Sequence, residues 1–522
     1  MRITNKIIQN NAISNINGNK VLEDNLNTQL ATGKKVNRPS DDPVVAIRAL
    51  RLRTNLSEVQ QYYKKNVPDA TSWLTITEGA IDTAVEVITN MYSDCTSGSE
   101  GFKTAEDRQK ILENMKGLRD EIYAIGNAES AGRYVFTGYR TETSLAFEKD
   151  TRQQYTITEQ LGPDSVGDKT YIDTQELEDL TASNALTGTT TEQDVTTNTV
   201  HRIRLSYNNC SDAVAPTIRY YDSTGTLQTV TANIISADDP ATDPYLSMQG
   251  NTGKAATFIP ETGELILSDG LYADLQNVKD ITGTKDAEGN EINEAEIRIT
   301  YEKAEWSKGD LRPEHYFYCE TPANNAAGKL VYNENYLTSQ TDDDTRQIIS
   351  YDVGFGQEVR VNTLANEVFT HDIGRDLEEM IANVEAVVDM EDTVSRLEDL
   401  IENTTDENDK EILQQKLDAA NKALTYLTDK MQKDFESGIT RTQGYLAHAN
   451  TALTTVGNRS ARVELVSNRL SSQETSFKTL SSENEDADIT EVAVQLSSVE
   501  LSYQAALMAT GKITQTSLLN YL

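Results

Sequence analysis

The last 35 residues of the chain, Asp488–Leu522, read DITEVAVQLSSVELSYQAALMATGKITQTSLLNYL. Asp488 and Glu491 have the spacing of an acidic N-cap and its capping-box partner. Apolar residues then recur every three or four positions, which is typical of a helix that packs along a coiled-coil seam. The seam consists of Ile489, Val492, Leu496, Val499, Tyr503, Ala506, Thr510 and Ile513. The residues between them are mostly short and uncharged, so we expect both faces of this helix to contact other helices.

Length and charge limit the possible functions. A chain of 522 residues has room for two to four domains. Its 47 basic and 83 acidic residues give a net charge of −36, which argues against nucleic acid and membrane surfaces as partners. No run of about 18 apolar residues predicts a membrane span. The N-terminus lacks the apolar core of a secretion signal, so export from the cell would need another route.

The first 35 residues predict a helix that is marginal by itself. Ile3, Ile7, Leu22, Leu26 and Leu30 supply an apolar face, with looser periodicity than at the C-terminus. Eight asparagines before position 30 oppose helix formation by their low propensity. We therefore expect residues 1–35 to be disordered in the free monomer and to fold on assembly.

Helical signals continue up to about residue 125, and a short β-like run flanked by glycines follows at residues 132–139. Gly33 has the position of a helix-ending residue, Ser40, Asp41 and Asp42 are the candidate N-caps of the next helix, and Pro43 fits its first turn. Periodic apolar seams then cover residues 45–63, residues 74–95 after a break at Pro68, and residues 111–125. Their alternating spacing of three and four predicts long helices packed as a bundle.

The middle of the chain, residues 140–366, predicts a β-rich inserted domain. Helical periodicity disappears there, and short alternating runs separated by turn signals take its place. One part, around residues 165–200, fits neither pattern. The expected strands lie at 155–158, 201–207, 217–221, 256–259, 264–268, 297–302 and 316–318.

Helices resume near Asp372. One seam covers residues 413–431, and apolar residues at strict sevens over 446–477 predict a single helix of roughly forty residues. The fold class expected is a mainly α helical bundle or coiled-coil rod, built from both chain termini, with a β-rich inserted domain. The expected segments are 1–40 and 486–522 as terminal coiled coils, 41–139 and 367–485 as the two halves of the rod, and 140–366 as the insertion.

The search for chemistry predicts no catalytic residue, no metal site and no cofactor. None of the four histidines has HExxH spacing. His315 and Cys319 would share one face of an expected strand, but a plain structural role is the better interpretation. The three cysteines, an odd number at wide spacing, indicate no disulfide framework.

Three motifs carry a resemblance to a known family. The segments LATGKKVNRPSDDP at 30–43 and RVELVSNRLSSQ at 462–473, with the C-terminal run quoted above, resemble the flagellin superfamily. The runs PSDDP at 39–43, GRYVFTGY at 132–139 and LLNYL at 518–522 are similar to its hook–filament junction branch, the hook-associated protein 3 family. The resemblance covers roughly residues 1–145 and 440–522.

This resemblance implies an adaptor of the bacterial flagellum that polymerises as a ring and joins the hook to the filament for motility. It implies secretion through the flagellar export apparatus, with an export chaperone, and a location at the hook–filament junction. The implied partners are further copies of the chain, flagellin and hook-associated protein 1. The expected assembly interface consists of Ile3, Ile7, Leu22, Leu26, Leu30, Ile489, Val492, Leu496, Val499, Tyr503, Ala506, Ile513, Leu518 and Leu522.

Two alternatives stay open at this point. The chain could be a filament flagellin, the structural subunit of the filament. The β-rich insertion could also be an active or sugar-binding module on a flagellin-like stem. A sugar-binding module would need aromatic side chains exposed in a groove, for which Trp306 and its neighbouring tyrosines are the candidates.

Overall fold

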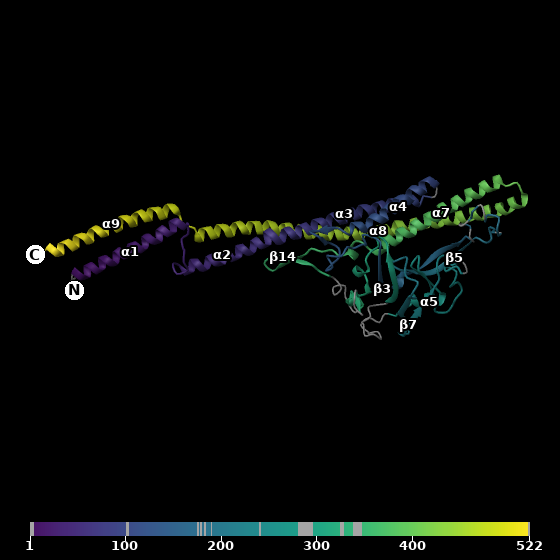
Figure 1. Cartoon of the computed structure of the whole chain (residues 1–522), viewed down its shortest axis with the longest axis horizontal. Helices are drawn as coiled ribbons and strands as arrows, with labels where there is room; N and C mark the ends of the chain where they lie inside the picture. The colour runs from purple at the N-terminus through teal and green to yellow at the C-terminus, as the bar shows by residue number, and fades with distance from the viewer. Residues whose placement is uncertain are drawn as a thin grey trace. The chain divides into compact units, whose positions relative to one another are not determined.

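The computed structural model describes residues 5–100, 104–174, 177, 180–181, 184–188, 190–239, 242–279, 296–323, 328–337 and 347–519 (Figure 1). The chain forms two compact units. The first contains residues 1–71, 351–359 and 461–522, and the second contains residues 72–350 and 360–460. Helical ends with a β-sheet-rich centre agree with the fold class expected from the sequence.

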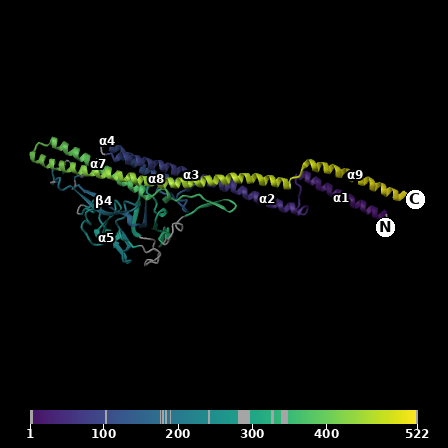
Figure 2. The ribbon, with the colours of Figure 1, turned by 180° about the vertical axis from the view of Figure 1, so that it is seen from behind.

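The first unit contains the two terminal helices, α1 (Asn5–Thr32) and α9 (Ile489–Leu519). It also contains α2 (Pro43–Gln61) and the end of the long helix α8 (Glu407–Glu485). The expected caps are present: Gly33 has a φ of +67°, and the Asp42 carboxylate accepts hydrogen bonds from the backbone N–H groups of Val44 and Val45. In both views α1 and α9 lie side by side and run antiparallel (Figures 1 and 2).

The break expected at Pro68 is absent. A π-helical turn at Tyr62–Asn66 follows α2 directly, and α3 (Val67–Gly98) continues from it. Proline is tolerated in the first turn of a helix because the missing N–H would have no partner there. The sequence analysis therefore predicted a helix end near Pro68, where the structure has only a π-helical turn between two α-helical segments.

In the second unit, α3 packs with α4 (Ala105–Ile125), α7 (His371–Asn403) and α8. The seam expected on α3 is almost completely buried, from Leu74 to Cys95. Thr104 and Asp107 form a reciprocal capping box at the start of α4. The helices approach most closely at Gly438 of α8, where an added Cβ would overlap Met380 Cε and lie 3.1 Å from Cys95 Sγ.

Helix α8 is twice as long as the sequence analysis predicted. It runs unbroken for 79 residues and unites the seams of 413–431 and 446–477, which were expected to belong to separate helices. Two glycines, Gly438 and Gly444, lie between these seams and lower the helix propensity there. Packing of the apolar face against α3 and α7 overrides that local preference.

We predict that Gly438→Ala destabilises the second unit, although alanine is the better helix former. The new methyl group would displace Met380, and overpacking of this kind costs about 1–3 kcal/mol. The matched control is Gly444→Ala on the same helix, where nothing lies within 4 Å of the added Cβ. Urea unfolding should show a gain of up to about 1 kcal/mol for the control. Equal effects of the two substitutions would contradict the close approach.

The β-rich centre contains two larger sheets. The six-stranded sheet has the order β13-β12-β3-β11-β6-β7, and the five-stranded sheet has the order β4-β5-β10-β9-β8. Only the β8–β9 pair is parallel among the pairs described within these sheets. Two short hairpins, β1–β2 and β14–β15, are separate from them.

The strands have the following bounds: β1 Glu129–Ser130, β2 Arg133–Tyr134, β3 Thr151–Leu161, β4 Val166–Asp173, β5 Thr196–Arg204, β6 Thr217–Tyr221, β7 Leu227–Thr231, β8 Asn233–Ile234, β9 Ala256–Ile259, β10 Glu264–Leu267, β11 Ile297–Trp306, β12 Tyr318–Pro322, β13 Lys329–Tyr332, β14 Ser350–Gly354 and β15 Gln357–Arg360. A short helix, α5 (Asp269–Leu275), follows β10.

The structure corrects one expectation about the sheets and removes the main support for one open alternative. The strand expected at 316–318 begins only at Tyr318, and His315 ends a 3-10 turn instead of sharing a strand face with Cys319. Trp306 is buried, stacks on Phe147, and donates its indole N–H to the Gln153 carbonyl oxygen. It is therefore a core residue and not an exposed platform for a sugar.

The part around residues 165–200 that the sequence analysis left unplaced packs on the α7–α8 pair. Leu177, Leu180 and Ala185 are buried. Lys416 and Lys422 of α8 donate hydrogen bonds to the carbonyl oxygens of Thr187 and Glu192, with N–O distances of 2.7 and 2.5 Å. Two strands, β4 and the start of β5, nevertheless lie within this part and pair with each other, so the sequence analysis missed them. The described residues between these two strands take their contacts from α7 and α8.

A buried ion network joins the five-stranded sheet to α7 and α8. Arg202 and Arg204 of β5 contact Glu379 of α7 at 2.7 and 3.0 Å, and Arg204 also contacts Asp376 at 2.6 Å. Arg441 of α8 reaches the same Asp376 at 3.0 Å. Burial alone would raise the pKa of Glu379, but the two arginines outweigh it and lower the pKa to about 2.

This network predicts acid sensitivity of the second unit. A carboxylate whose pKa is depressed by folding stabilises the native state above its unfolded pKa of about 4.3, and that contribution disappears as the pH falls toward 2. Glu379→Gln should lower the free energy of unfolding at pH 7 by up to about 3–5 kcal/mol, because it removes a carboxylate that Arg202 and Arg204 share and leaves each of these buried arginines with one carboxylate fewer. It should also flatten the loss of stability between pH 5 and pH 2. Urea unfolding followed by tryptophan fluorescence measures both effects, with the exposed Glu402→Gln on the same helix as the control.

Candidate assembly interface

The α1–α9 pair contains most of the residues expected to form the assembly interface. Val492 of α9 is buried, and Leu496, Val499, Tyr503 and Ala506 are half-buried along the same face. This face of α9 matches the seam read from the sequence. Within the first unit it lies against α1.

Helix α1 presents a largely polar face to α9. Leu26 is its one buried side chain among those described, at 4% exposure. The half-buried positions that share this face are mostly polar, with a spacing of three and four. They are Gln9, Ala12, Ile16, Asn19, Glu23 and Gln29. The seam between the two helices therefore buries little apolar surface, which agrees with the weak helix predicted from the asparagines.

The apolar residues of α1 mostly point away from α9. Three of the expected interface residues, Ile7, Leu22 and Leu30, are exposed, Leu22 at 47%. They belong to a larger exposed set on this helix that also includes Ile8, Ile13 and Val21. The sequence analysis found the apolar residues of α1 but did not predict that most of them would point away from α9.

Helix α9 carries a second apolar stripe that the sequence analysis missed. Val494, Leu501 and Met508 recur at intervals of seven and are each about two-thirds exposed. Leu507 and the expected interface residue Ile489 are exposed as well. The spacing of seven residues could have revealed this stripe in the sequence. The analysis assigned the helix to the more regular seam of Val492 and Val499 instead. The pair thus has apolar stripes on its outer surface from both helices.

The remaining expected residues are placed only in part. Ile513 and Leu518 lie within α9, in its last turns. Ile3 and Leu522 lie outside the described residues. All the described members of the expected set therefore come together on one helical pair.

A compact joint connects the base of this pair to α2 and α8. Lys35 N–H donates to the Glu485 carbonyl oxygen at 2.7 Å, and Ala487 N–H donates to the Gly33 carbonyl oxygen at 2.9 Å. Lys34 pairs with Asp486 at 2.6 Å, and Arg53 pairs with the buried Glu485. Hydrogen bonds from Arg53 and Lys34 lower the pKa values of Glu485 and Asp486, respectively. The turn after α1 and the turn between α8 and α9 are thus bonded to each other.

We predict a sharp change in hydrogen exchange at this joint. In the dilute monomer the amides of Ile13–Leu22 should exchange hydrogen almost as fast as in an unfolded chain, because few buried contacts stabilise α1. The amides of Lys35 and Ala487 should be protected, and Lys34→Met should reduce their protection. Slow exchange throughout α1 in the monomer would contradict the expected folding on assembly.

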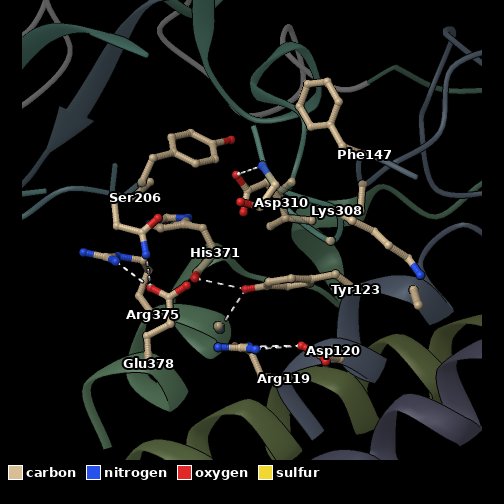
Figure 3. Close-up of a pocket in the computed structure, with 18 of the residues that line it drawn as sticks. Arg119, Asp120, Tyr123, Phe147, Ser206, Lys308, Asp310, His371, Arg375 and Glu378 are labelled. Atoms are coloured by element: carbon tan, nitrogen blue, oxygen red, sulfur yellow. Dashed lines mark hydrogen bonds and ion pairs between the residues drawn. The ribbon is translucent and has the colours of Figure 1, made fainter. Parts of the chain in front are cut away.

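The second unit also contains a polar cavity of about 640 Å³ (Figure 3). It lies among α4, the start of α7 and the loops around residues 206–209 and 307–311. Its charged side chains are largely neutralised: Arg119 pairs with Asp120 at 2.9 Å and Arg375 with Glu378 at 2.6 Å. Tyr123 donates to the carbonyl oxygens of Thr370 and His371. These contacts favour a structural role for the cavity walls.

Ionisable groups outside this cavity also have structural partners. Burial lowers the pKa of His315 to about 3, and its ring nitrogen lies 3.0 Å from the Ser144 carbonyl oxygen. Burial raises the pKa of Cys95 and of Cys210 to about 12, which leaves both thiols unreactive near neutral pH. In the part of the chain that the structure describes, no three acidic, histidine or cysteine side chains are placed to hold a metal ion. No described helix is long and apolar enough to cross a membrane.

Comparison with known families matches both ends of the chain. Residues 3–141 match the bacterial flagellin N-terminal helical region, and residues 439–522 match the bacterial flagellin C-terminal helical region. Both ends of the chain are therefore similar to bacterial flagellins. The two flagellin regions contain the two helices, α1 and α9, that lie side by side in the structure.

The chain is also similar to two hook-associated proteins. Flagellar hook-associated protein 3 from Escherichia coli K12 is 32% identical over 117 residues, which are 22% of this chain and 37% of that protein. The protein of the same name from Salmonella typhimurium LT2 is 28% identical over 145 residues, 28% of this chain and 45% of that protein. The chain therefore spans less than half the length of these relatives.

Two further proteins, one flagellin and one solved structure, are similar to this chain. A flagellin from Clostridium tyrobutyricum is 27% identical over 127 residues, 24% of this chain and 33% of that protein. The solved structure of the flagellar junction protein FlgL from Legionella pneumophila is 12% identical, with 85% of this chain and 100% of that chain covered. Its TM-score of 0.29 is too low to support an argument about the fold.

Proposed function

We propose that this chain is a structural component of the bacterial flagellum that polymerises as a ring and joins the hook to the flagellin filament. Its role would be mechanical and not enzymatic. The observation that carries the proposal is the pairing of the two flagellin regions. Their helices α1 and α9 lie together and expose apolar stripes, and the matched relatives include hook-associated proteins.

The exposed stripes supply the energy for assembly. A monomeric soluble protein rarely exposes this many contiguous aliphatic side chains, so such a surface indicates a contact site. Full burial of one leucine or isoleucine side chain contributes about 1.5–3 kcal/mol. Copies that pack their α1–α9 pairs together would bury Leu22, Val494 and Leu501, and this gain would offset the entropy lost when α1 becomes ordered.

The proposal includes partners and a location. Copies of this chain would contact one another, the flagellin at one end of the ring and hook-associated protein 1 at the other. The chain would leave the cell through the flagellar export apparatus, aided by an export chaperone, and act outside the cell at the hook–filament junction. We retain the division into terminal coiled coils, rod halves and insertion as part of this proposal.

A filament flagellin is the second candidate. It is favoured by the match to the Clostridium tyrobutyricum flagellin, but that match has lower identity than those to the two hook-associated proteins and covers a smaller share of its relative. The two candidates differ in copy number and position, because a flagellin fills the whole filament and an adaptor forms one zone. A sugar-binding role for the insertion lost its main candidate when Trp306 proved to be buried.

Deletion of the gene tests the proposal. The junction role predicts cells with hooks but without filaments, and unassembled flagellin in the culture medium, as seen by electron microscopy and immunoblotting. Filaments of normal number but altered shape would identify a flagellin variant. Normal filaments and normal motility would contradict both roles.

Complementation of the deletion tests the apolar stripe itself. Leu501→Asp should fail to restore filaments, because burying an unpaired carboxylate between copies costs several kcal/mol. Ser502→Asp places the same charge on the neighbouring exposed residue, away from the stripe, and should restore them. Detection of both variants in the medium shows that each was synthesised and exported. Equal complementation by both variants would contradict a role for the stripe.

A further inference from the structure

The start of α2 carries an exposed apolar and basic face. Val44 is 68% exposed and Leu50 is 62% exposed, with Ile47 between them also exposed. Arg48 and Arg51 lie among these residues, and the described residues offer neither of them an ion pair or a hydrogen bond. The neighbouring residues that contact α8, such as Arg53 and Gln60, lie on the other side of α2. We call Val44, Ile47, Arg48, Leu50 and Arg51 the α2 face.

This face is a local exception to the charge of the chain. Residues 34–65 contain eight basic and three acidic residues, although the whole chain has a net charge of −36. A basic surface with leucine-sized apolar side chains fits a partner that is acidic and also exposes aliphatic groups. The chain itself has such a surface at the end of α8.

The end of α8 carries the complementary residues. Residues 483–491 contain five acidic residues and no basic residue. Glu485 and Asp486 pair with Arg53 and Lys34 of the same chain, but the side chain of Glu483 is exposed and has no ion pair among the described residues. Leu480, one turn away, is 47% exposed. By helical periodicity both lie opposite the face of α8 that contacts α2 through Glu474 and Glu485.

We propose that the α2 face of one copy docks on Leu480 and Glu483 of the next copy. Arg51 and Arg48 would pair with Glu483, while Val44, Ile47 and Leu50 would cover Leu480. Because the two surfaces lie on opposite sides of the α2–α8 pair, the contact is head-to-tail. Contacts of this kind form a ring when the rotation between copies closes, as the proposed function requires. The proposal rests on the proposed polymerisation, and it identifies a second contact besides the stripes of α1 and α9.

The α2 face and the Leu480–Glu483 surface lie at the same position along the axis of the helix pair, which supports direct contact between copies. Asn484 donates a hydrogen bond to the Val45 carbonyl oxygen, so the start of α2 and the end of α8 lie at the same height within one copy. Copies arranged side by side in a ring would therefore bring the α2 face opposite Leu480 and Glu483 with little axial shift.

Cysteine cross-linking in the flagellum tests this contact. The full chain carrying Leu50→Cys and Leu480→Cys replaces the native chain in cells, and isolated flagella are treated with a short bismaleimide. We expect a ladder of cross-linked copies on a denaturing gel. The matched control pairs Leu50→Cys with Leu465→Cys, which lies fifteen residues or about 22 Å farther along α8 and should give no ladder. The native chain, whose cysteines are buried or half-buried, is the reagent control.

The outcomes separate this contact from the proposed function. A chain that is absent from the isolated flagella would overturn both. A chain that is present but gives no ladder, or that cross-links to a different protein through the cysteine introduced at position 50, would overturn the docking of a second copy and leave the flagellar role standing.

Charge reversal supplies an independent readout. Arg48→Glu with Arg51→Glu should lower the yield of the cross-link between positions 50 and 480 by about tenfold, and adding Glu483→Arg should restore most of it. A merely structural role for these exposed arginines predicts no such rescue. An unchanged yield in the double variant, or a loss that Glu483→Arg does not repair, would contradict the pairing.

Discussion

The narrow, mostly polar seam between α1 and α9 determines how this protein is built. One helix contributes valines, leucine and tyrosine to the seam, while the other contributes glutamines, asparagine and glutamate with a single buried leucine. Such a pair is weak by itself, because polar side chains that face a seam gain little on leaving water. Its aliphatic side chains remain outside, where only other molecules can cover them. This exposure supports our proposal that assembly with other molecules, and not the monomer alone, completes the terminal pair.

Outside the α1–α9 pair, the helices and sheets are held by stronger interactions. The joint of Gly33–Lys35 with Glu485–Ala487 combines two backbone hydrogen bonds with two ion pairs, one of them to a buried carboxylate. The α3 seam in the second unit is mostly apolar, and Gly438 permits a close approach of three helices. The β-rich centre is fixed to α7 and α8 by a buried network of arginines and carboxylates. The stronger of these stabilising interactions thus lie outside the α1–α9 pair.

Sequence patterns predicted the helices, their caps and most strands, because these depend on local spacing. Strands at 217–221 and 256–259 agree with the structure to the residue, and Asp42 is the N-cap among the three candidates at 40–42. The failures arose where tertiary packing overrides local preference: α8 continues through Gly438, and the segment around 177–187 takes its order from helices beneath it. The apolar residues of α1 were identified, but which side faces α9 depends on the partner helix and cannot be read from α1 alone.

The position of the chain along the flagellum is the most direct test of its role. Antibodies against the β-rich insertion, coupled to gold particles, can be applied to intact flagella isolated with their hooks attached. A junction adaptor predicts label in one zone only, where the hook meets the filament. Label along the whole filament would identify a filament subunit and contradict the junction role, and flagella without label would exclude the chain from the structure altogether.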